Sequence, residues 1–223
     1  MPEQKQNLII LHISQAGKPD IKMVTEAGLI GKIGINSSGV GVCLNAIRAQ
    51  GVDITRLPTH LGLRMVLESE SREDAVQKLE RYGVASSCHM LIGDRSGSVG
   101  LECSSLDFKK LDMDSAGRVC HANHYLVDHP GVEDTVWLKD SLFRTERIKE
   151  LCKLYSPEAP TFEGIKGLYR DEMNFPVSIN RLFSEGASTS ETLFNIVMEL
   201  KERKAEITLG RPSSPEDFVA LTF

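Results

Sequence analysis

Short β-prone runs that follow one another in pairs, with only a turn between them, most limit the folds open to this chain. The first pair lies at residues 8–14 and 21–26, and the second at 28–36 and 40–47. Gly17 and Pro19 in the first turn and Gly39 in the second supply the backbone geometry that tight turns need. We therefore predict two hairpins in one four-stranded antiparallel sheet. This pairing argues against a Rossmann fold, in which strands alternate singly with helices.

The rest of the chain changes from helical to extended patterns and back. Apolar residues recur every three or four positions over 60–82, 135–155 and 161–169. Ser71 and Asp74 match a helix start, so the first stretch predicts two helices. β-prone runs return at 88–93, 99–104 and 118–123, which predicts a second sheet, and again at 192–200, 205–210 and 218–223.

Two apolar sheets with helices outside each favour an α+β fold built as a four-layer αββα sandwich. Periodicity alone leaves other α+β layouts open. No repeat or low-complexity linker divides the chain, so we predict a single domain over 1–223. A chain of 223 residues with 41% hydrophobic residues is long enough to bury a substantial core.

Charge and hydropathy exclude several classes of partner. The formal charge is −5, and the basic stretches at 109–110 and 201–204 are short and flanked by acids, so we expect no nucleic-acid partner. No apolar run approaches the roughly 18 residues that span a bilayer, so no membrane partner is expected. A polar N-terminus without a secretory signal and five cysteines without a CxxC pair suit a reducing, cytoplasmic location.

No cofactor or metal is expected from the motifs. Gly39 and Gly41 lack the third glycine of a dinucleotide loop, and there is no Walker lysine motif. The densest reactive cluster contains Cys120, His121 and His124, but its spacing matches no standard zinc site. Alternation along a strand would also point Cys120 and His121 to opposite faces, which argues against a nucleophilic Cys–His pair.

Asn45 and Asn123 are amides within otherwise apolar β-prone runs. A buried amide needs hydrogen-bond partners, and amide N–H groups directed into a cleft stabilise a developing oxyanion. A structural and a catalytic role are equally open from this pattern. Arg181 is similarly a cation in an apolar segment, where it can form a surface salt bridge or belong to a site.

Several segments in a fixed order then resemble a known family. They include the stretches 15–17, 25–28, 45–46, 63–69, 121–124, 175–179, 187–196 and 209–212. With them the chain resembles the acyl-coenzyme A:6-aminopenicillanic acid acyltransferase family, within the N-terminal-nucleophile hydrolases. The resemblance runs nearly end to end and implies the same αββα sandwich.

The resemblance also implies a chemistry. Members cleave themselves to expose an N-terminal cysteine, which attacks an amide or thioester with its own amine as base, and water or an amine then takes the acyl group. By position, Asn123 and Asn45 are implied as oxyanion donors and Arg181 as the residue that orients nucleophile or substrate. His121, Ser188 and Thr189 are implied at the substrate. The family's penicillin enzyme has an arginine where this chain has Thr189.

The nucleophile itself is not found in the printed sequence. The family places its Gly-Cys site and a following aspartate upstream of the segment that aligns with Leu8. Three expectations stay open: one subunit or part of an active acyltransferase, an inactive relative that binds an acylated ligand, or a truncation without function. The implied partners are a small-molecule acyl substrate, with acyl-CoA as a candidate donor, and a missing α-segment or a second copy of the chain.

Overall fold

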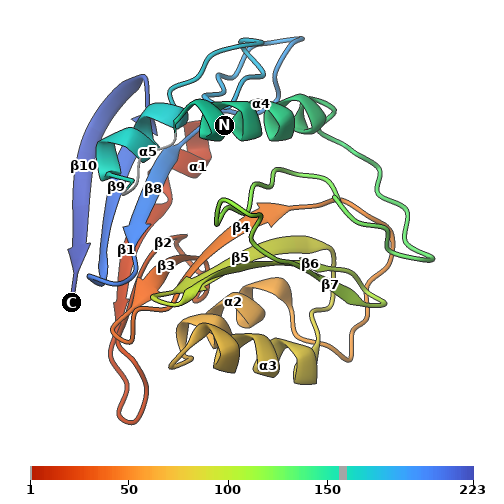
Figure 1. Cartoon of the computed structure of the whole chain (residues 1–223), viewed down its shortest axis with the longest axis vertical. Helices are drawn as coiled ribbons and strands as arrows, with labels where there is room; N and C mark the ends of the chain where they lie inside the picture. Colours follow the sequence, from red (N-terminus) through yellow and green to blue (C-terminus); the bar gives the residue numbers. More distant parts are fainter. Residues whose placement is uncertain (1, 156–159) are drawn as a thin grey trace.

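The computed structural model describes residues 2–155 and 160–223. It contains a large antiparallel sheet of seven strands in chain order and a small antiparallel sheet of three strands. The large sheet consists of β1 (Leu8–Ile13), β2 (Ile21–Glu26), β3 (Ile33–Asn36), β4 (Gly41–Ala46), β5 (Cys88–Asp94), β6 (Gly97–Cys103) and β7 (Phe108–Leu111). The small sheet consists of β8 (Phe194–Glu199), β9 (Lys204–Arg211) and β10 (Ser214–Thr222). Figure 1 shows the small sheet beside the first strands of the large one.

Both predicted N-terminal hairpins are confirmed. β1 pairs with β2 from Leu8 opposite Glu26 to Ile13 opposite Ile21. β3 is shorter than predicted and pairs with β4 around a turn that Asn36 organises. The Asn36 Oδ1 accepts hydrogen bonds from the amides of Ser38 and Val40 at 3.0 and 2.9 Å. Its Nδ2 donates to the carbonyls of Leu67 and Ser69, which joins this turn to the end of a helix.

The predicted second sheet is wrong in its composition. β5 and β6 continue the large sheet through β4, and the small sheet is built from the C-terminal strands instead. The predicted strand at 118–123 is irregular, and Phe108–Leu111 takes the place beside β6. The reason is that segment 118–123 crosses over a face of the sheet, where Val119 lies against Gly100, and its backbone amides bond to side chains such as Ser141.

Two helices cover one face of the large sheet, as predicted. They are α2 (Thr59–Leu67) and α3 (Arg72–Tyr82). The Ser71 hydroxyl accepts a hydrogen bond from the amide of Asp74 at 3.1 Å, which confirms the predicted helix start. Alternate residues of β2 and β4–β6 form the main core with these helices: Met23, Val42, Met90, Ile92, Leu101, Leu63, Val66, Leu67 and Leu79.

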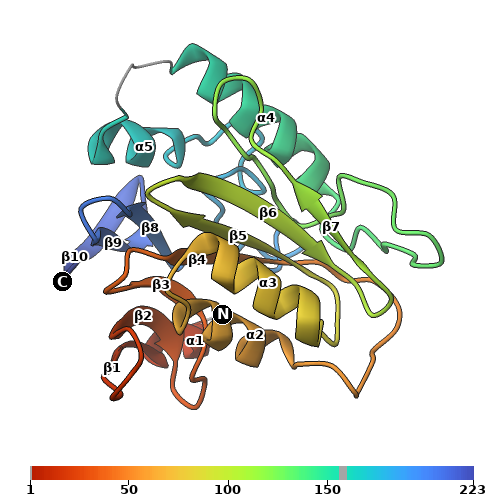
Figure 2. The ribbon, with the colours of Figure 1, turned by 60° about the horizontal axis from the view of Figure 1, so that its bottom comes forward.

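The opposite face of β1–β3 packs against the small sheet. Val24 and Ile35 meet Ala205, Ile207 and Leu221 in a second buried cluster. Two further helices, α4 (Asp140–Leu154) and α5 (Phe162–Leu168), lie on the far side of the large sheet from α2 and α3 (Figures 1 and 2). The result is the predicted α+β sandwich of two sheets with helices outside.

The short helix α1 (Pro2–Gln6) precedes β1. Helix α4 begins at Asp140 rather than near the predicted position 135. Thr135 is held in a loop, because both its amide and its hydroxyl donate to the carbonyl of Arg48. In residues 2–155 and 160–223 no helix has the length and apolar character needed to cross a membrane.

Gly31 permits the loop before β3 to lie directly on α2. A Cβ at this position would be 2.1 Å from the His60 carbonyl oxygen and 2.7 Å from the Arg64 amide nitrogen. Backbone atoms cannot move aside easily, so we expect Gly31→Ala to lower the free energy of unfolding by about 2 kcal/mol or more. Thermal unfolding followed by circular dichroism would show a fall in Tm of about 4–8 °C.

The matched control is Gly167→Ala in α5, where a Cβ would meet nothing within 4 Å. There alanine is expected to stabilise the protein by up to about 1 kcal/mol, because it reduces the backbone freedom of the unfolded chain. Equal effects of the two substitutions would contradict this view of the Gly31 contact.

Candidate functional site

Polar side chains meet on the inner face of the large sheet, defined here as the face turned away from α2 and α3. Strand alternation places Asn45, His89 and Glu102 on this face, while their neighbours point into the main core. Asn45 is directly opposite His89 in the β4–β5 pair, and His89 is directly opposite Glu102 in the β5–β6 pair. The small sheet packs mainly over β1–β3, and its edge reaches Gly41 of β4 and Gly93 of β5 through Leu200. The part of the inner face around Glu102 is instead covered by the segment 118–129.

Glu102 is fully buried and organises that segment. Its carboxylate accepts hydrogen bonds from His121 Nε2 at 2.9 Å and His129 Nε2 at 3.3 Å, and from the amides of Leu126 and Val127 at 2.6 and 3.2 Å. Burial acts to raise the pKa of Glu102, but the hydrogen bonds from His121 and the two amides outweigh it and hold the pKa below its usual value. Glu102 therefore remains an acceptor.

His121 lies between Glu102 and a second histidine. Its Nδ1 faces the Ala122 carbonyl at 2.8 Å and its Nε2 faces Glu102 at 2.9 Å, so acceptors lie on both sides of the ring. The ring stacks on His89 with centroids 3.6 Å apart and an angle of 9° between the planes. Burial and the neighbouring His121 lower the pKa of His89 to about 2, so His89 is neutral.

The neutral His89 fixes the amide of Asn45. His89 Nδ1 donates to Asn45 Oδ1 at 3.0 Å, while His89 Nε2 is buried, has no hydrogen-bond partner among the described residues and lies over Gly100. Because the amide oxygen of Asn45 is occupied, its NH2 group is turned to the other side. Within the described part of the chain, no hydrogen bond uses this NH2 group.

Asn123 is held in the same way beside Asn45. Its Nδ2 donates to the carbonyl of Ala46 at 2.9 Å, which brings the two amides together at the end of β4. Its Oδ1 accepts from Arg144 Nη2 at 2.9 Å, and its backbone amide donates to the Ser141 hydroxyl at 2.6 Å. Each asparagine therefore has its oxygen bound to the protein and retains an N–H donor.

Asp140 links Asn123 to Arg181. Its Oδ2 accepts from Arg144 Nε at 2.7 Å and also forms an ion pair with Arg181 Nη2. Burial acts to raise the pKa of Asp140, but Arg181 and Arg144 outweigh it and lower the pKa. Arg181 Nη1 donates to the Ser190 hydroxyl at 3.0 Å, and its Nε is buried without a partner among the described residues. Asp140 thus aligns two arginines whose side chains are only 15% and 10% exposed.

Five of the six residues singled out in the sequence lie in this connected set. Asn45, Asn123, His121 and Arg181 are joined as described, and Ser188 is connected through Ser190, whose carbonyl accepts its hydroxyl at 2.8 Å. Thr189 is exposed and makes none of the hydrogen bonds that join these residues in the structure.

Sequence reasoning missed Glu102, Asp140 and Arg144. The sequence pattern could have identified Glu102, because it is an acid inside the apolar run of β6, just as Asn45 and Asn123 are amides inside apolar runs. Asp140 and Arg144 are four residues apart, which predicts a pair on one helix face. That spacing alone gives no sign that a second arginine from a distant segment joins them.

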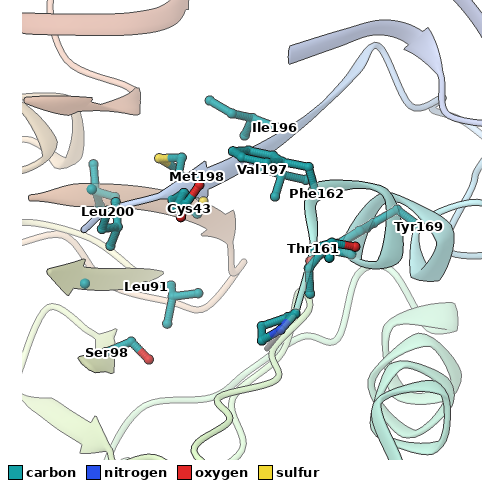
Figure 3. Close-up of a pocket in the computed structure, with 16 residues that line it drawn as sticks. Cys43, Leu91, Ser98, Thr161, Phe162, Tyr169, Ile196, Val197, Met198 and Leu200 are labelled. Atoms are coloured by element: carbon teal, nitrogen blue, oxygen red, sulfur yellow. The ribbon is translucent and has the colours of Figure 1, made fainter. Parts of the chain in front are cut away.

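An apolar cavity of about 610 Å³ continues along the inner face from the polar cluster. Figure 3 shows Cys43 and Leu91 on strands of the large sheet, with Phe162, Tyr169 and Val197 among the other lining residues. β8 forms one wall and is the edge strand of the small sheet, since β9 is its sole partner in the described chain. Burial raises the pKa of the Cys43 thiol to about 12, so it is not a thiolate nucleophile.

In the part of the chain that the structure describes, no group of three or more His, Cys, Asp or Glu side chains could hold a metal ion. The histidines instead form hydrogen bonds with acids and hydroxyls. His129 Nδ1, for example, bonds to Asp107 at 2.6 Å, and His124 Nδ1 to the Ser141 hydroxyl at 2.7 Å.

The two-sheet sandwich places the chain among proteins with the N-terminal-nucleophile hydrolase fold. It superposes on penicillin V acylase from Agrobacterium tumefaciens with a TM-score of 0.66 and 15% identity, covering 94% of this chain and 71% of that one. A variant of conjugated bile acid hydrolase from Clostridium perfringens gives a TM-score of 0.59 and 12% identity, with 97% and 89% of the two chains covered. At this identity the likeness shows the fold.

Sequence comparison shows the family. Residues 1–214 match the family model described as acyl-coenzyme A:6-aminopenicillanic acid acyl-transferase. The 40 kDa form of the acyl-coenzyme A:6-aminopenicillanic-acid-acyltransferase of Emericella nidulans is 43% identical over 221 residues, which is 98% of this chain. The chain belongs to this acyltransferase family. It spans 61% of the length of that relative.

Proposed function

We propose that this protein is the larger part of an acyltransferase or amidohydrolase that acts on amide or thioester bonds of acylated small molecules. The observation that carries the proposal is the pair of side-chain amides at the end of β4. The oxygen of each is occupied, by His89 for Asn45 and by Arg144 for Asn123, so N–H donors remain. Donors fixed in this way stabilise the negative charge that develops on a carbonyl oxygen during acyl transfer.

The nucleophile is proposed to come from a segment outside the printed sequence. Among the described cysteines, Cys43 lies in the cavity but has a raised pKa, and it is within a strand, without an α-amine to act as base. A cysteine at a chain terminus carries that amine. Its thiolate would attack the carbonyl carbon, the leaving amine or thiol would take the proton, and water or an amine would then accept the acyl group.

The free edge of β8 is the proposed place for that segment. The small sheet has three strands opposite seven in the large one, and the cavity of about 610 Å³ lies beside its edge strand β8. An extended segment added along β8 would pair with an exposed backbone edge and cover the inner face of β4–β6. The terminus of such a strand would lie on the same face of the large sheet as Asn45.

Ligand binding without turnover is the second candidate function. The apolar cavity is formed by the chain alone, with Leu91, Phe162 and Val197 among its lining residues, so an acyl group can be bound without an added segment. Thermal shift with acylated compounds, together with the absence of product, would favour this function.

Native mass spectrometry of the protein purified from its source tests the main proposal. We expect a bound fragment or an N-terminal extension that begins with cysteine after processing, together with hydrolysis or transfer of thioester and amide substrates. Asn123→Asp keeps the size of the side chain and removes its N–H donors, so kcat should fall about 10²–10³-fold. Asn174→Asp, the same change at an exposed position, should leave kcat unchanged.

Absence of any such cysteine-bearing segment, with no turnover by the native protein, would contradict the proposed acyl transfer. An equal effect of the two asparagine substitutions on kcat would contradict the role given to Asn123.

A further inference from the structure

Two cysteines lie where the segment that carries Asn123 meets the last turns of α4. Cys120 precedes His121 in that segment, and Cys152 is near the end of α4. Both are free and half-buried, and both line one cavity of about 370 Å³. The two thiols are neighbours beside this cavity.

The two thiols differ in reactivity. The neighbouring Cys120 thiol, helped by the positive charge of Arg118, lowers the pKa of the Cys152 thiol to about 7. The neighbouring Cys152 thiol and burial raise the pKa of Cys120. Cys152 is therefore the attacking thiolate at neutral pH, and Cys120 remains protonated as the thiol that can resolve a mixed disulfide.

The cavity around the pair favours an anionic reagent. Four cations line it, Lys110, Arg118, Lys149 and Lys153, against two acids, Asp112 and Asp114. Lys110 and Lys149 are paired with Glu80 and Glu146, at 2.6 and 2.8 Å. Arg118 and Lys153 form no salt bridge within the described residues, so their charges are free to attract an anion.

The other cysteines provide an internal contrast. Cys88 and Cys103 are also neighbours, directly opposite each other in the β5–β6 pair, but they are only 1% and 3% exposed and belong to the main core. A dissolved reagent cannot reach them in the folded protein. The reactive pair is distinguished by its access to a charged cavity.

We propose that Cys120 and Cys152 are a thiol–disulfide exchange site for an anionic low-molecular-weight disulfide. The Cys152 thiolate attacks one sulfur of the reagent, which breaks its S–S bond and releases one thiolate. Cys120 then gives up its proton and attacks the Cys152 sulfur, which releases the second thiol. Two protein thiols are oxidised to one disulfide, and the reagent is reduced to two thiols that take the two protons.

The disulfide would attach the segment that carries Asn123 to the end of α4, in addition to its contacts with the start of α4. The first turn of α4 already holds Asn123 through Ser141 and Arg144. A disulfide at Cys152 would add a covalent hold through Cys120, three residues before Asn123 in the sequence. The effect on catalysis rests on the proposed function, whereas formation of the bond and its effect on stability do not.

The test uses glutathione disulfide as the probe. The purified chain is incubated with defined ratios of reduced and oxidised glutathione at pH 7.5, remaining thiols are blocked with N-ethylmaleimide, and peptides are mapped by mass spectrometry. We expect a Cys120–Cys152 cross-linked peptide, with Cys88 and Cys103 blocked only after unfolding. The oxidised protein should melt at a temperature higher by about 5 °C or more, because the bond restricts the unfolded chain.

Cysteine variants distinguish a specific disulfide between Cys120 and Cys152 from non-specific oxidation of the protein. Cys120→Ser and Cys152→Ser should each abolish the cross-link and the rise in melting temperature, whereas Cys88→Ala should retain both. A stable mixed disulfide of Cys152 with glutathione in the unsubstituted protein would overturn the proposal, because Cys120 would then not resolve it. So would a response of Cys88 and Cys103 in the folded protein equal to that of Cys120 and Cys152. Neither readout needs a substrate, so failure of the proposed acyl transfer would leave this test intact.

Discussion

Glu102→Ala is expected to lower the free energy of unfolding by about 3–5 kcal/mol, because it removes the shared acceptor of a buried polar cluster. His121, His129 and the amides of Leu126 and Val127 would lose their partner on the inner face of the large sheet. Leaving these buried donors without an acceptor accounts for this cost. Urea denaturation at pH 7, followed by circular dichroism, measures the change.

The control for Glu102 is Glu146→Ala. The Glu146 side chain is 70% exposed and has one ion pair, with Lys149, so its removal should change the free energy of unfolding by less than about 0.5 kcal/mol. A change below about 1 kcal/mol for Glu102→Ala would show that the segment 118–129 does not depend on this carboxylate.

The same carboxylate predicts a pH dependence of stability. The pKa of Glu102 is lowered in the folded protein, so below the usual glutamate value of 4.5 the unfolded state binds this proton more readily. The stability contributed by Glu102 is thus present above about pH 5 and is lost as the pH falls through the folded-state pKa. Denaturation between pH 7 and pH 3 should show a smaller loss in Glu102→Gln than in the unsubstituted protein. Parallel curves would contradict the lowered pKa.

Asp140→Asn is the second change with a large expected effect, because it removes the charge shared by Arg144 and Arg181. Leaving two mostly buried guanidinium groups without a counter-ion should lower the free energy of unfolding by about 2–3 kcal/mol. Arg144 would no longer be held against Asn123, so for the acyl transfer proposed above kcat should fall about 10–100-fold through misplacement of the proposed oxyanion donor.

Asp171→Asn provides the comparison for Asp140. The Asp171 side chain is as buried as that of Asp140, 12% exposed in both cases, but it bonds to Arg147 and has no link to Asn123. We expect a smaller loss of stability and an unchanged kcat. If the two aspartate variants lose kcat equally, Asp140 acts through general stability and not by positioning Asn123.

Much of the fold could be predicted from local patterns. The two N-terminal hairpins, the helix that begins after Ser71 and the three C-terminal strands form where turn residues and hydrophobic periodicity place them. Each depends on contacts between residues that are close in sequence. The strand predicted at 118–123 failed because the segment is β-prone in composition, while the side chains of Asp114 and Ser141 accept hydrogen bonds from its backbone amides.

The candidate site was predictable only in part. Asn45, Asn123 and Arg181 stand out as polar groups in apolar runs, and the structure joins them in one set of contacts. Their partners come from elsewhere: His89 from the next strand, and Arg144 and Asp140 from the start of α4. Whether a given amide keeps a free N–H donor depends on which partner occupies its oxygen, and that is a property of the assembled site.

The sequence by itself determined the two N-terminal hairpins and, through the ordered motifs of the family, the sandwich, because turn residues and motifs are local properties of the chain. The tertiary structure alone decided that the large sheet has seven strands, that segment 118–123 crosses its inner face, and that Asp140 serves two arginines. It also decided that Cys120 meets Cys152. The physical reason is that a buried polar or reactive group takes its character from neighbours distant in sequence, through burial and hydrogen bonds that form only when the sheets and helices pack.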